Sequence, residues 1–251
     1  MEKKIIAVVN PAAAGAKVKK TWPSKKKYFQ REFSKFEEIY TEAPGDAVKI
    51  AQKAVKGNYD YIMSVGGDGT VNEIINGMLS VEKEYRNTKL IIFPLGTGSD
   101  LSRTLGLPSN PEDFIKLIKR EKTKSIKAVK AEFLNHRQQK TIRYFLNMAD
   151  CGMGAEVAKK LNQSKKFIKG SLSYLISIFQ VLFRYQNKEI EVEADDKLLY
   201  RGKINTVIIA HGNYFGGGIN IAPKADLYGD KLNLILLKDF SKMGIILNLI
   251  K

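Results

Sequence analysis

Cysteine and histidine are scarce in this sequence, which has one cysteine, Cys151, and two histidines among 251 residues. A single cysteine cannot form an intramolecular disulfide, and this set offers too few soft ligands for a structural zinc site. Long apolar runs are also missing. The longest, from Leu172 to Phe183, has about 12 residues, whereas a bilayer span needs about 20. The sequence therefore predicts a cytoplasmic protein without a disulfide, a secretory leader or a membrane-spanning helix.

Acidic residues are in the minority, since 42 lysines and arginines face 26 aspartates and glutamates and leave a formal charge of +16. Such a charge attracts nucleic acid, an anionic membrane face or phosphorylated small molecules. Nucleic acid is disfavoured, because aromatic residues do not alternate with basic ones as a stacking surface requires. The basic residues gather in two clusters, each either a solvated helix face or a contact for an anionic leaflet. The clusters are Lys17, Lys19, Lys20, Lys25, Lys26 and Lys27, and Lys159, Lys160, Lys165, Lys166 and Lys169.

The first half of the chain alternates short β-rich runs with helical stretches, which is typical of a mostly parallel sheet flanked by helices. Expected strands are 5–10, 38–41, 61–65 and 90–94, and expected helices are 17–36, 46–56, 71–79, 100–105 and 111–120. The second half reads as mainly antiparallel β, with strands expected at 126–133, 141–148, 189–194, 203–211 and 232–238. We therefore predict an α/β domain over residues 1–124 and a β-rich domain over residues 125–251.

One helix is expected within the β-rich half, over Gly170 to Tyr185. Its apolar residues recur every three or four positions and so lie on one helical face. Core packing is the ordinary explanation of such a face, and contact with a membrane surface is the alternative.

The strongest local motif is Gly66-Gly67-Asp68-Gly69-Thr70, followed by Val71-Asn72-Glu73. Three glycines after a strand let backbone N–H groups approach a ligand closely, and the N-terminus of the helix that follows favours phosphate. Asp68 inside such a cradle suggests Mg²⁺ or hydroxyl chemistry, because a bare anion would repel a polyphosphate. A tight turn with Thr70 as the N-cap is the structural alternative.

Two further turns follow expected strands. Gly96-Thr97-Gly98-Ser99-Asp100 again frees the backbone, and Ser99 or Asp100 can cap the next helix. Asn10 and Pro11 open the other turn, which runs to Gly15 and leads toward the same edge of the sheet. Neither a Walker loop nor a Gly-x-Gly-x-x-Gly motif after the first strand is present, so the phosphate site is of another kind.

These motifs resemble the diacylglycerol kinase catalytic domain of bacterial lipid kinases. The similarity covers essentially the whole chain and includes, in family order, Thr41 before Pro44-Gly45-Asp46, Pro94-Leu95-Gly96-Thr97-Gly98 with Asp100 and Arg103, Asn76-Gly77, Lys169-Gly170 with Tyr174, and Tyr214-Phe215-Gly216-Gly217-Gly218. The resemblance implies an N-terminal α/β domain of the phosphofructokinase and NAD kinase type, a C-terminal β-sandwich, and ATP with Mg²⁺ as the phosphate donor.

Carried over position by position, the resemblance makes Asp68 the catalytic residue, near the transferred phosphoryl group. Phosphoryl transfer depends mainly on positioning and charge neutralisation, so such a site needs little else. The implied nucleotide contacts are Asn10, Pro11, Gly15, Thr41, Gly66, Gly67, Asp68, Gly69, Thr70, Val71, Asn72, Gly96, Thr97 and Gly98.

The chain departs from the family pattern in three places. Ser99 stands where the family has asparagine. Gly229-Asp230 reverses an Asp-Gly order in a segment that resembles a structural Mg²⁺ loop, so Asp226, Asp230 and Lys231 are the candidate metal residues, and a solvated turn is the alternative. The chain also ends at Lys251, where the family continues for about 50 residues toward a glutamate implied to act as base. Apolar surface left open near residues 245–250 predicts a homodimer or low solubility.

The resulting hypothesis is an ATP- and Mg²⁺-dependent lipid kinase that phosphorylates a lipid hydroxyl, with diacylglycerol converted to phosphatidic acid. We expect it in the cytoplasm, bound peripherally to the anionic inner membrane face through its lipid substrate. The alternatives are a kinase for a sphingoid base, another lipid or NAD, and a catalytically silent nucleotide-binding or regulatory protein.

Overall fold

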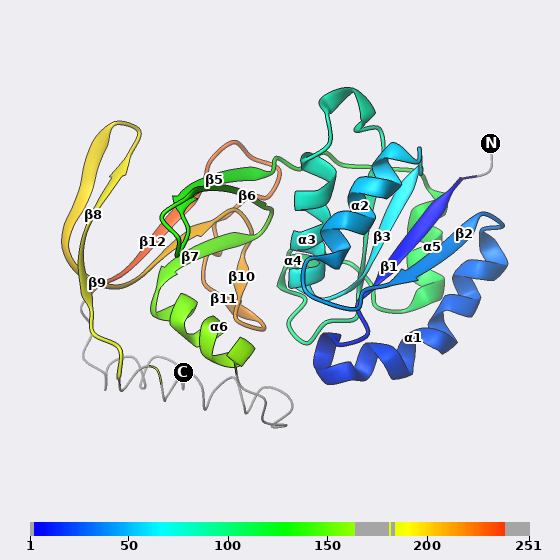
Figure 1. The fold of residues 1–251 in the computed structure, drawn as a ribbon, viewed down its shortest axis with the longest axis horizontal. Coiled ribbons are helices and arrows are strands. Elements are labelled where there is room, and N and C mark those ends of the chain that lie inside the picture. The colour runs from blue at the N-terminus through cyan, green and yellow to red at the C-terminus, as the bar shows by residue number, and fades with distance from the viewer. Residues whose placement is uncertain (1–2, 164–180, 182–183, 239–251) are drawn as a thin grey trace. The chain divides into compact units, whose positions relative to one another are not determined.

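The computed structural model describes residues 3–163, 181 and 184–238. The chain divides into two compact units (Figure 1). The first unit combines residues 1–147 with 212–230, and the second combines residues 148–211 with 231–251. The domain boundary expected near residue 124 stays a prediction.

A four-stranded parallel sheet forms the centre of the first unit, as expected from the alternating pattern. Its strands lie in the order β2-β1-β3-β4, and each neighbouring pair runs parallel. This order brings the carboxyl ends of β1, β3 and β4 to one edge of the sheet. The bounds are β1 Ile5–Val9, β2 Phe36–Tyr40, β3 Tyr61–Gly66 and β4 Lys89–Pro94.

Helices cover both faces of this sheet, because the residues of β1 alternate between two cores. Ile5, Ala7 and Val9 pack with α1 (Ala13–Glu32) and α5 (Pro111–Lys119). Ile6 and Val8 pack with α2 (Asp46–Lys56) and α3 (Asp68–Leu79). Burying both faces requires continuous apolar strands, and β1 and β3 are buried at every position.

Shorter elements complete the first unit. They are the 3₁₀ turn η1 (Lys83–Tyr85), α4 (Asp100–Thr104), the antiparallel hairpin β5 (Val129–Leu134) and β6 (Lys140–Phe145), and the small hairpin β10 (Tyr214–Phe215) and β11 (Ile219–Asn220).

Helix α1 differs from the expected helix over residues 17–36 at both ends. Its first turn holds Ala14, Gly15 and Ala16 at positive φ, and regular helical geometry continues after them. It ends at Glu32, because Phe33 adopts an extended conformation that leads into β2. A left-handed alanine costs roughly 1–2 kcal/mol. The strained turn therefore needs support from the packing around it.

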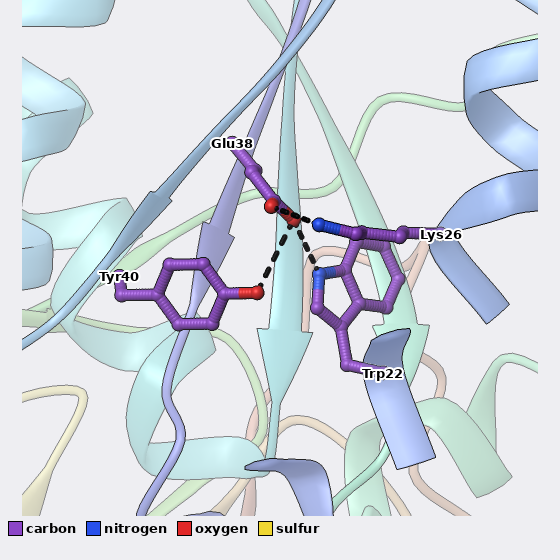
Figure 2. A network of polar contacts seen from close by, with 4 residues as sticks. All are labelled: Trp22, Lys26, Glu38 and Tyr40. Atoms are coloured by element: carbon purple, nitrogen blue, oxygen red, sulfur yellow. Dashed lines mark hydrogen bonds and ion pairs between the residues drawn. The ribbon is translucent and has the colours of Figure 1, made fainter. Parts of the chain in front are cut away.

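A polar network joins α1 to the edge strand β2 (Figure 2). The Trp22 indole N–H donates to Glu38 Oε2 at 2.8 Å, and Lys26 Nζ donates to Glu38 Oε1 at 2.6 Å. The Tyr40 hydroxyl lies 3.4 Å from the same Oε2. Trp22 is fully buried and packs on the rings of Phe29, Phe36 and Phe93. Glu38 thus accepts a hydrogen bond from the indole N–H, which is the polar group of the buried Trp22 side chain.

The second unit is built on an antiparallel sheet, as the β-rich pattern predicted. Strand β9 (Lys197–Ala210) is central and pairs with β7 (Met148–Gly152), β8 (Lys188–Ala194) and β12 (Asn233–Lys238). Helix α6 (Met153–Gln163) follows β7 directly. The single strand expected over residues 141–148 is wrong, because residues 146–147 interrupt it and its two parts belong to different units.

Two expectations lie outside the described residues: most of the helix over 170–185, and the apolar surface near 245–250. Lys165, Lys166 and Lys169 of the second basic cluster lie outside them as well. Within residues 3–163, 181 and 184–238, no helix is long and apolar enough to cross a bilayer.

Replacing Glu38 tests how much the polar network contributes to stability. Glu38→Leu leaves the buried Trp22 N–H without an acceptor, and we expect a loss of about 1–3 kcal/mol in the free energy of unfolding, measured in urea. Glu38→Gln keeps an acceptor oxygen and removes only the charge, so it should lose less than half as much. Equal losses in the two variants would contradict this account of the network.

Candidate functional site

The three turns predicted to bind phosphate lie at the carboxyl ends of β1, β3 and β4, on one edge of the parallel sheet. Asn10 connects two of them, because its Nδ2 donates to Thr70 Oγ1 at 3.1 Å. The Asn10 Oδ1 accepts the Ala12 N–H at 3.1 Å and closes its own turn. The structure therefore brings together the first and second predicted turns through side chains.

The glycines of the turn after β3 make room for its own helix. A Cβ on Gly66 would lie 2.4 Å from Thr70 Oγ1, so glycine allows Thr70 to fold back toward the strand. Helix α3 begins at Asp68, with Gly67 in the N-cap position and no side-chain cap. The alternative with Thr70 as N-cap is wrong, since Thr70 lies within the first turn and is buried.

The turns after β3 and β4 meet backbone to backbone. A Cβ on Gly96 would lie 2.4 Å from the Gly67 Cα and 3.1 Å from its nitrogen. Only glycine permits this approach, which sets two short loops with few side chains beside each other. The exposed Gly69 has open space around it, so it is not held by packing.

Asp68 connects these turns a second time, through its carboxylate. Its Oδ2 accepts the Asp100 N–H at 3.0 Å, and its Oδ1 accepts the Leu101 N–H at 3.1 Å. Asp68 therefore caps α4, the role expected of Ser99 or Asp100. Ser99 stands in the N-cap position in a left-handed conformation, and its side chain makes no cap bond.

Asp100 is a second carboxylate at the same place. It is 6% exposed, its Oδ2 accepts the Gly217 N–H at 2.8 Å, and its Oδ1 is buried without a hydrogen-bond partner. Burial raises the pKa of the Asp100 carboxyl above its usual range. The negative charge of Asp68 adds to this rise, and the bond from Gly217 opposes it. The site thus holds two carboxylates of which one resists ionisation.

The segment after residue 211 returns to the first unit and lies against α4. The Asn213 N–H donates to Thr104 Oγ1 at 3.3 Å, and Gly217 reaches Asp100 as described. The Arg103 guanidinium stands 5.5 Å from the Tyr214 ring centroid. This return loop, Gly212–Gly218, therefore forms part of the site.

The remaining predicted nucleotide contacts are spread over the same edge of the sheet. The Thr41 N–H donates to Val9 O at 2.9 Å, which places Thr41 beside the end of β1. Pro11 and Gly15 belong to the first turn, and Thr97 and Gly98 to the third, with Thr97 exposed. Val71 is buried in a core instead of facing the turn.

Asn72 has a structural partner. Its Nδ2 donates to the Tyr144 carbonyl oxygen of β6 at 3.0 Å. The amide group predicted to contact nucleotide is thus engaged with the hairpin that follows the α/β region.

The candidate metal residues do not come together as a metal site. Asp226 Oδ1 accepts the Tyr228 N–H at 3.0 Å in a tight turn, and Asp230 forms an ion pair with Lys127. Lys231 is exposed. Among the residues that the structure describes, no three histidines, cysteines or carboxylates gather where they could hold a metal ion. The loop over residues 226–231 does not fit a structural Mg²⁺ site.

Sequence reasoning included Asp100 and the segment Tyr214 to Gly218 in the family resemblance, but it did not assign either of them to the site. The only role proposed for Asp100 from its residue type was that of a helix cap. The signal for its role was its position directly after a glycine-rich turn, but its burial depends on Gly217, which is 117 residues away.

Comparison with known proteins identifies the relatives of this chain. The protein-family model described as "Diacylglycerol kinase catalytic domain" matches residues 4–131. A second family model, "YegS C-terminal NAD kinase beta sandwich-like domain", matches residues 147–251. The diacylglycerol kinase of Staphylococcus haemolyticus is 28% identical over 244 residues, which cover 96% of this chain and 70% of that protein. The diacylglycerol kinase of Bacillus subtilis is 29% identical over 220 residues, covering 85% and 69%.

A solved structure is similar as well. The crystal structure of a diacylglycerol kinase from Bacillus anthracis superposes with a TM-score of 0.69 at 26% identity, covering 99% of this chain and 78% of that one. The similarity therefore extends over both units of the chain.

The contact between Gly67 and Gly96 gives a prediction with a matched control. Gly96→Ala places a methyl group against the Gly67 backbone, and we expect a loss of about 1–3 kcal/mol in the free energy of unfolding. Gly69→Ala adds the same methyl group in open space within α3 and should gain roughly 0.5–1 kcal/mol from helix propensity. The free energies of unfolding of both variants are measured in urea. Similar effects of the two substitutions would show that the turns do not touch.

Proposed function

Because the chain belongs to the diacylglycerol kinase catalytic domain family, we propose that it transfers the γ-phosphoryl group of ATP to the hydroxyl of diacylglycerol. The product is phosphatidic acid. The observation that carries the proposal is the pair of carboxylates, Asp68 and Asp100, set between two glycine turns at the edge of the parallel sheet. Ligands bind at this edge in open α/β sheets.

The nucleotide is assigned to the turns after β1, β3 and β4. The close backbone contact between Gly67 and Gly96 sets these turns side by side, and the phosphate groups are assigned to the main-chain N–H groups of the turns. The N-terminus of α3 adds a favourable dipole at the same point. Asn10 and Thr70, which are bonded to each other, keep the first turn beside the second.

The carboxylate pair supplies the acid–base chemistry. As the lipid hydroxyl oxygen forms its bond to the γ-phosphorus, its proton passes to the pair, and the bond from the γ-phosphorus to the leaving oxygen of ADP breaks. Burial raises the pKa of the Asp100 carboxyl, which makes this group a better proton acceptor than an exposed aspartate.

Magnesium is proposed at this pair and not at the loop over 226–231. The Oδ1 of Asp100 is buried without a hydrogen-bond partner, and an unpaired carboxylate oxygen is a ligand that a hard cation takes. When bound with ATP, Mg²⁺ neutralises phosphate charge. The protein residues hold and orient the groups around it.

We propose that the protein binds its lipid substrate at a membrane surface. Lys17, Lys19, Lys20 and Lys27 are exposed on α1, whereas Lys26 is engaged with Glu38. The Tyr28 side chain is exposed on the same helix. An anionic leaflet complements such a basic helix, and each lysine near it contributes about 1 kcal/mol.

Label transfer tests the reaction. The chain is incubated with ATP labelled at the γ-phosphate, Mg²⁺ and dioleoylglycerol in micelles containing phosphatidylglycerol, and label is expected in phosphatidic acid. Asp68→Asn and Asp100→Asn should each lower the rate by roughly 10²–10⁴-fold, the range for a lost acid–base group. Asp100→Asn should also raise the Tm at pH 7, because it removes a carboxyl group whose burial disfavours its charge.

The outcomes separate the alternatives. Parallel reactions offer sphingosine or NAD as the acceptor. Label in sphingosine 1-phosphate or NADP, and not in phosphatidic acid, would show that the substrate is not diacylglycerol. ATP binding without transfer to any acceptor would identify a silent nucleotide-binding protein, in which Asp68 serves only to cap α4. Full activity in both asparagine variants would place the chemistry elsewhere.

The basic face of α1 is tested on vesicles. Lys19→Gln and Lys20→Gln should each weaken binding to phosphatidylglycerol vesicles about fivefold in sedimentation assays, as expected for 1 kcal/mol. Binding to phosphatidylcholine vesicles should be weak and unchanged. Lys56→Gln, at the end of α2 in the same unit, is the matched control, and an equal effect there would contradict the assignment to α1.

A further inference from the structure

The candidate site is closed by a ring of hydrogen bonds that passes through segments far from it in sequence. The ring begins on α3, which starts at Asp68 and carries Asn76 two turns later. Asn76 is 8% exposed, and both the nitrogen and the oxygen of its side-chain amide form hydrogen bonds. Its Nδ2 donates to the Tyr144 carbonyl at 2.8 Å, and its Oδ1 accepts the Tyr144 N–H at 2.9 Å. A side chain of α3 thus pairs with β6 as a neighbouring strand would.

The ring continues three residues after Tyr144. The Asn147 Nδ2 donates to the Tyr214 carbonyl at 3.0 Å, and the Asn147 carbonyl accepts the Gly212 N–H at 2.8 Å. A Cβ on Gly212 would lie 2.1 Å from Asn147 Oδ1, so glycine is needed at this contact. Asn147 therefore fixes the beginning of the return loop.

The return loop closes the ring at the carboxylates. Gly217 donates to Asp100 Oδ2 at 2.8 Å, and the Asp100 N–H donates to Asp68 Oδ2 at 3.0 Å. Asp68 is the first residue of α3, where the ring began. Strands β10 and β11 contribute two residue pairs to holding this loop, and Asn213 adds bonds to Thr104, Ala222 and Ala225. The bonds of Asn147 and Gly217 fix its two ends.

We infer that Asn76 and Asn147 are positioning residues for the Asp68–Asp100 pair. Neither side-chain amide is assigned to a contact with nucleotide or lipid. Asn76 holds β6 on α3, Asn147 holds the return loop on the residues after β6, and the loop places the Gly217 N–H on Asp100. Removing either amide should release Gly217 and change the surroundings of the Asp100 carboxyl, since linked hydrogen bonds in a buried site support one another.

Hydrogen exchange tests the ring without reference to activity. The variants are Asn147→Asp, which keeps the size of the side chain and removes its donor, and Asn76→Asp. The second variant removes the Asn76 donor to the Tyr144 carbonyl and leaves the Asn72 donor to the same oxygen in place. Exchange of backbone amides in the peptide over residues 212–220 should accelerate at least tenfold in both, while β1 and β3 keep their protection. Asn110→Ala is the matched control, because Asn110 caps α5 outside the ring and its loss costs stability of about 1 kcal/mol.

Kinetics test the positioning role, which rests on the proposed function. Both variants should lower kcat roughly 10–100-fold with the KM for ATP within twofold of the parent, whereas Asn110→Ala should leave both parameters unchanged. If Asn76→Asp does not fold, Asn147→Asp decides alone. Unchanged exchange over 212–220, or exchange no faster than in Asn110→Ala, overturns the inference. If the parent chain transfers no phosphate, the proposed function fails, and the exchange result still decides whether the ring exists.

Discussion

The Asp68 carboxylate is the interaction on which the geometry of the site depends. It follows β3, yet both of its oxygens accept N–H groups at the start of α4, which follows β4. The start of α4 is thereby fixed to the start of α3, and the contact between Gly67 and Gly96 brings the backbones of the two turns together. Short glycine turns lack side chains that could pack them, so one charged acceptor with two donors orders both.

This arrangement places a destabilising group beside a stabilising one. Asp100 is buried next to Asp68, its Oδ1 has no partner, and burial raises the pKa of its carboxyl. Such a group lowers the stability of the fold at neutral pH, because the unfolded chain ionises it more readily than the folded chain does. The left-handed conformations of Ala14 and Ala16 in the first turn also lower the stability of the fold. Strain and unsatisfied polar atoms gather at functional sites, and here they gather at the edge of the sheet where the glycine turns lie.

The sequence was sufficient for what is local. The parallel sheet, the glycine turns and the antiparallel second unit followed from strand periodicity and from glycines placed after strands, and the family resemblance was readable in Gly66-Gly67-Asp68-Gly69-Thr70. It was not sufficient for contacts across long separations. The cap on α4 comes from a residue 32 positions earlier, and Asn72 donates to Tyr144, which lies 72 positions later. Asp100 is covered by a loop 117 positions later. No periodic pattern encodes such pairs, since each depends on how the whole unit packs.

The central claim is that Asp100 is a buried carboxyl group coupled to Asp68 in a site for phosphoryl transfer. Carbon-13 NMR of the aspartate carboxyl groups, recorded against pH with Asp100→Asn for assignment, tests this directly. The account predicts that the Asp100 resonance titrates at higher pH than those of exposed aspartates, and that it shifts when ATP and Mg²⁺ are added. An Asp100 carboxyl that titrates together with the exposed aspartates and does not respond to ATP and Mg²⁺ would contradict the account.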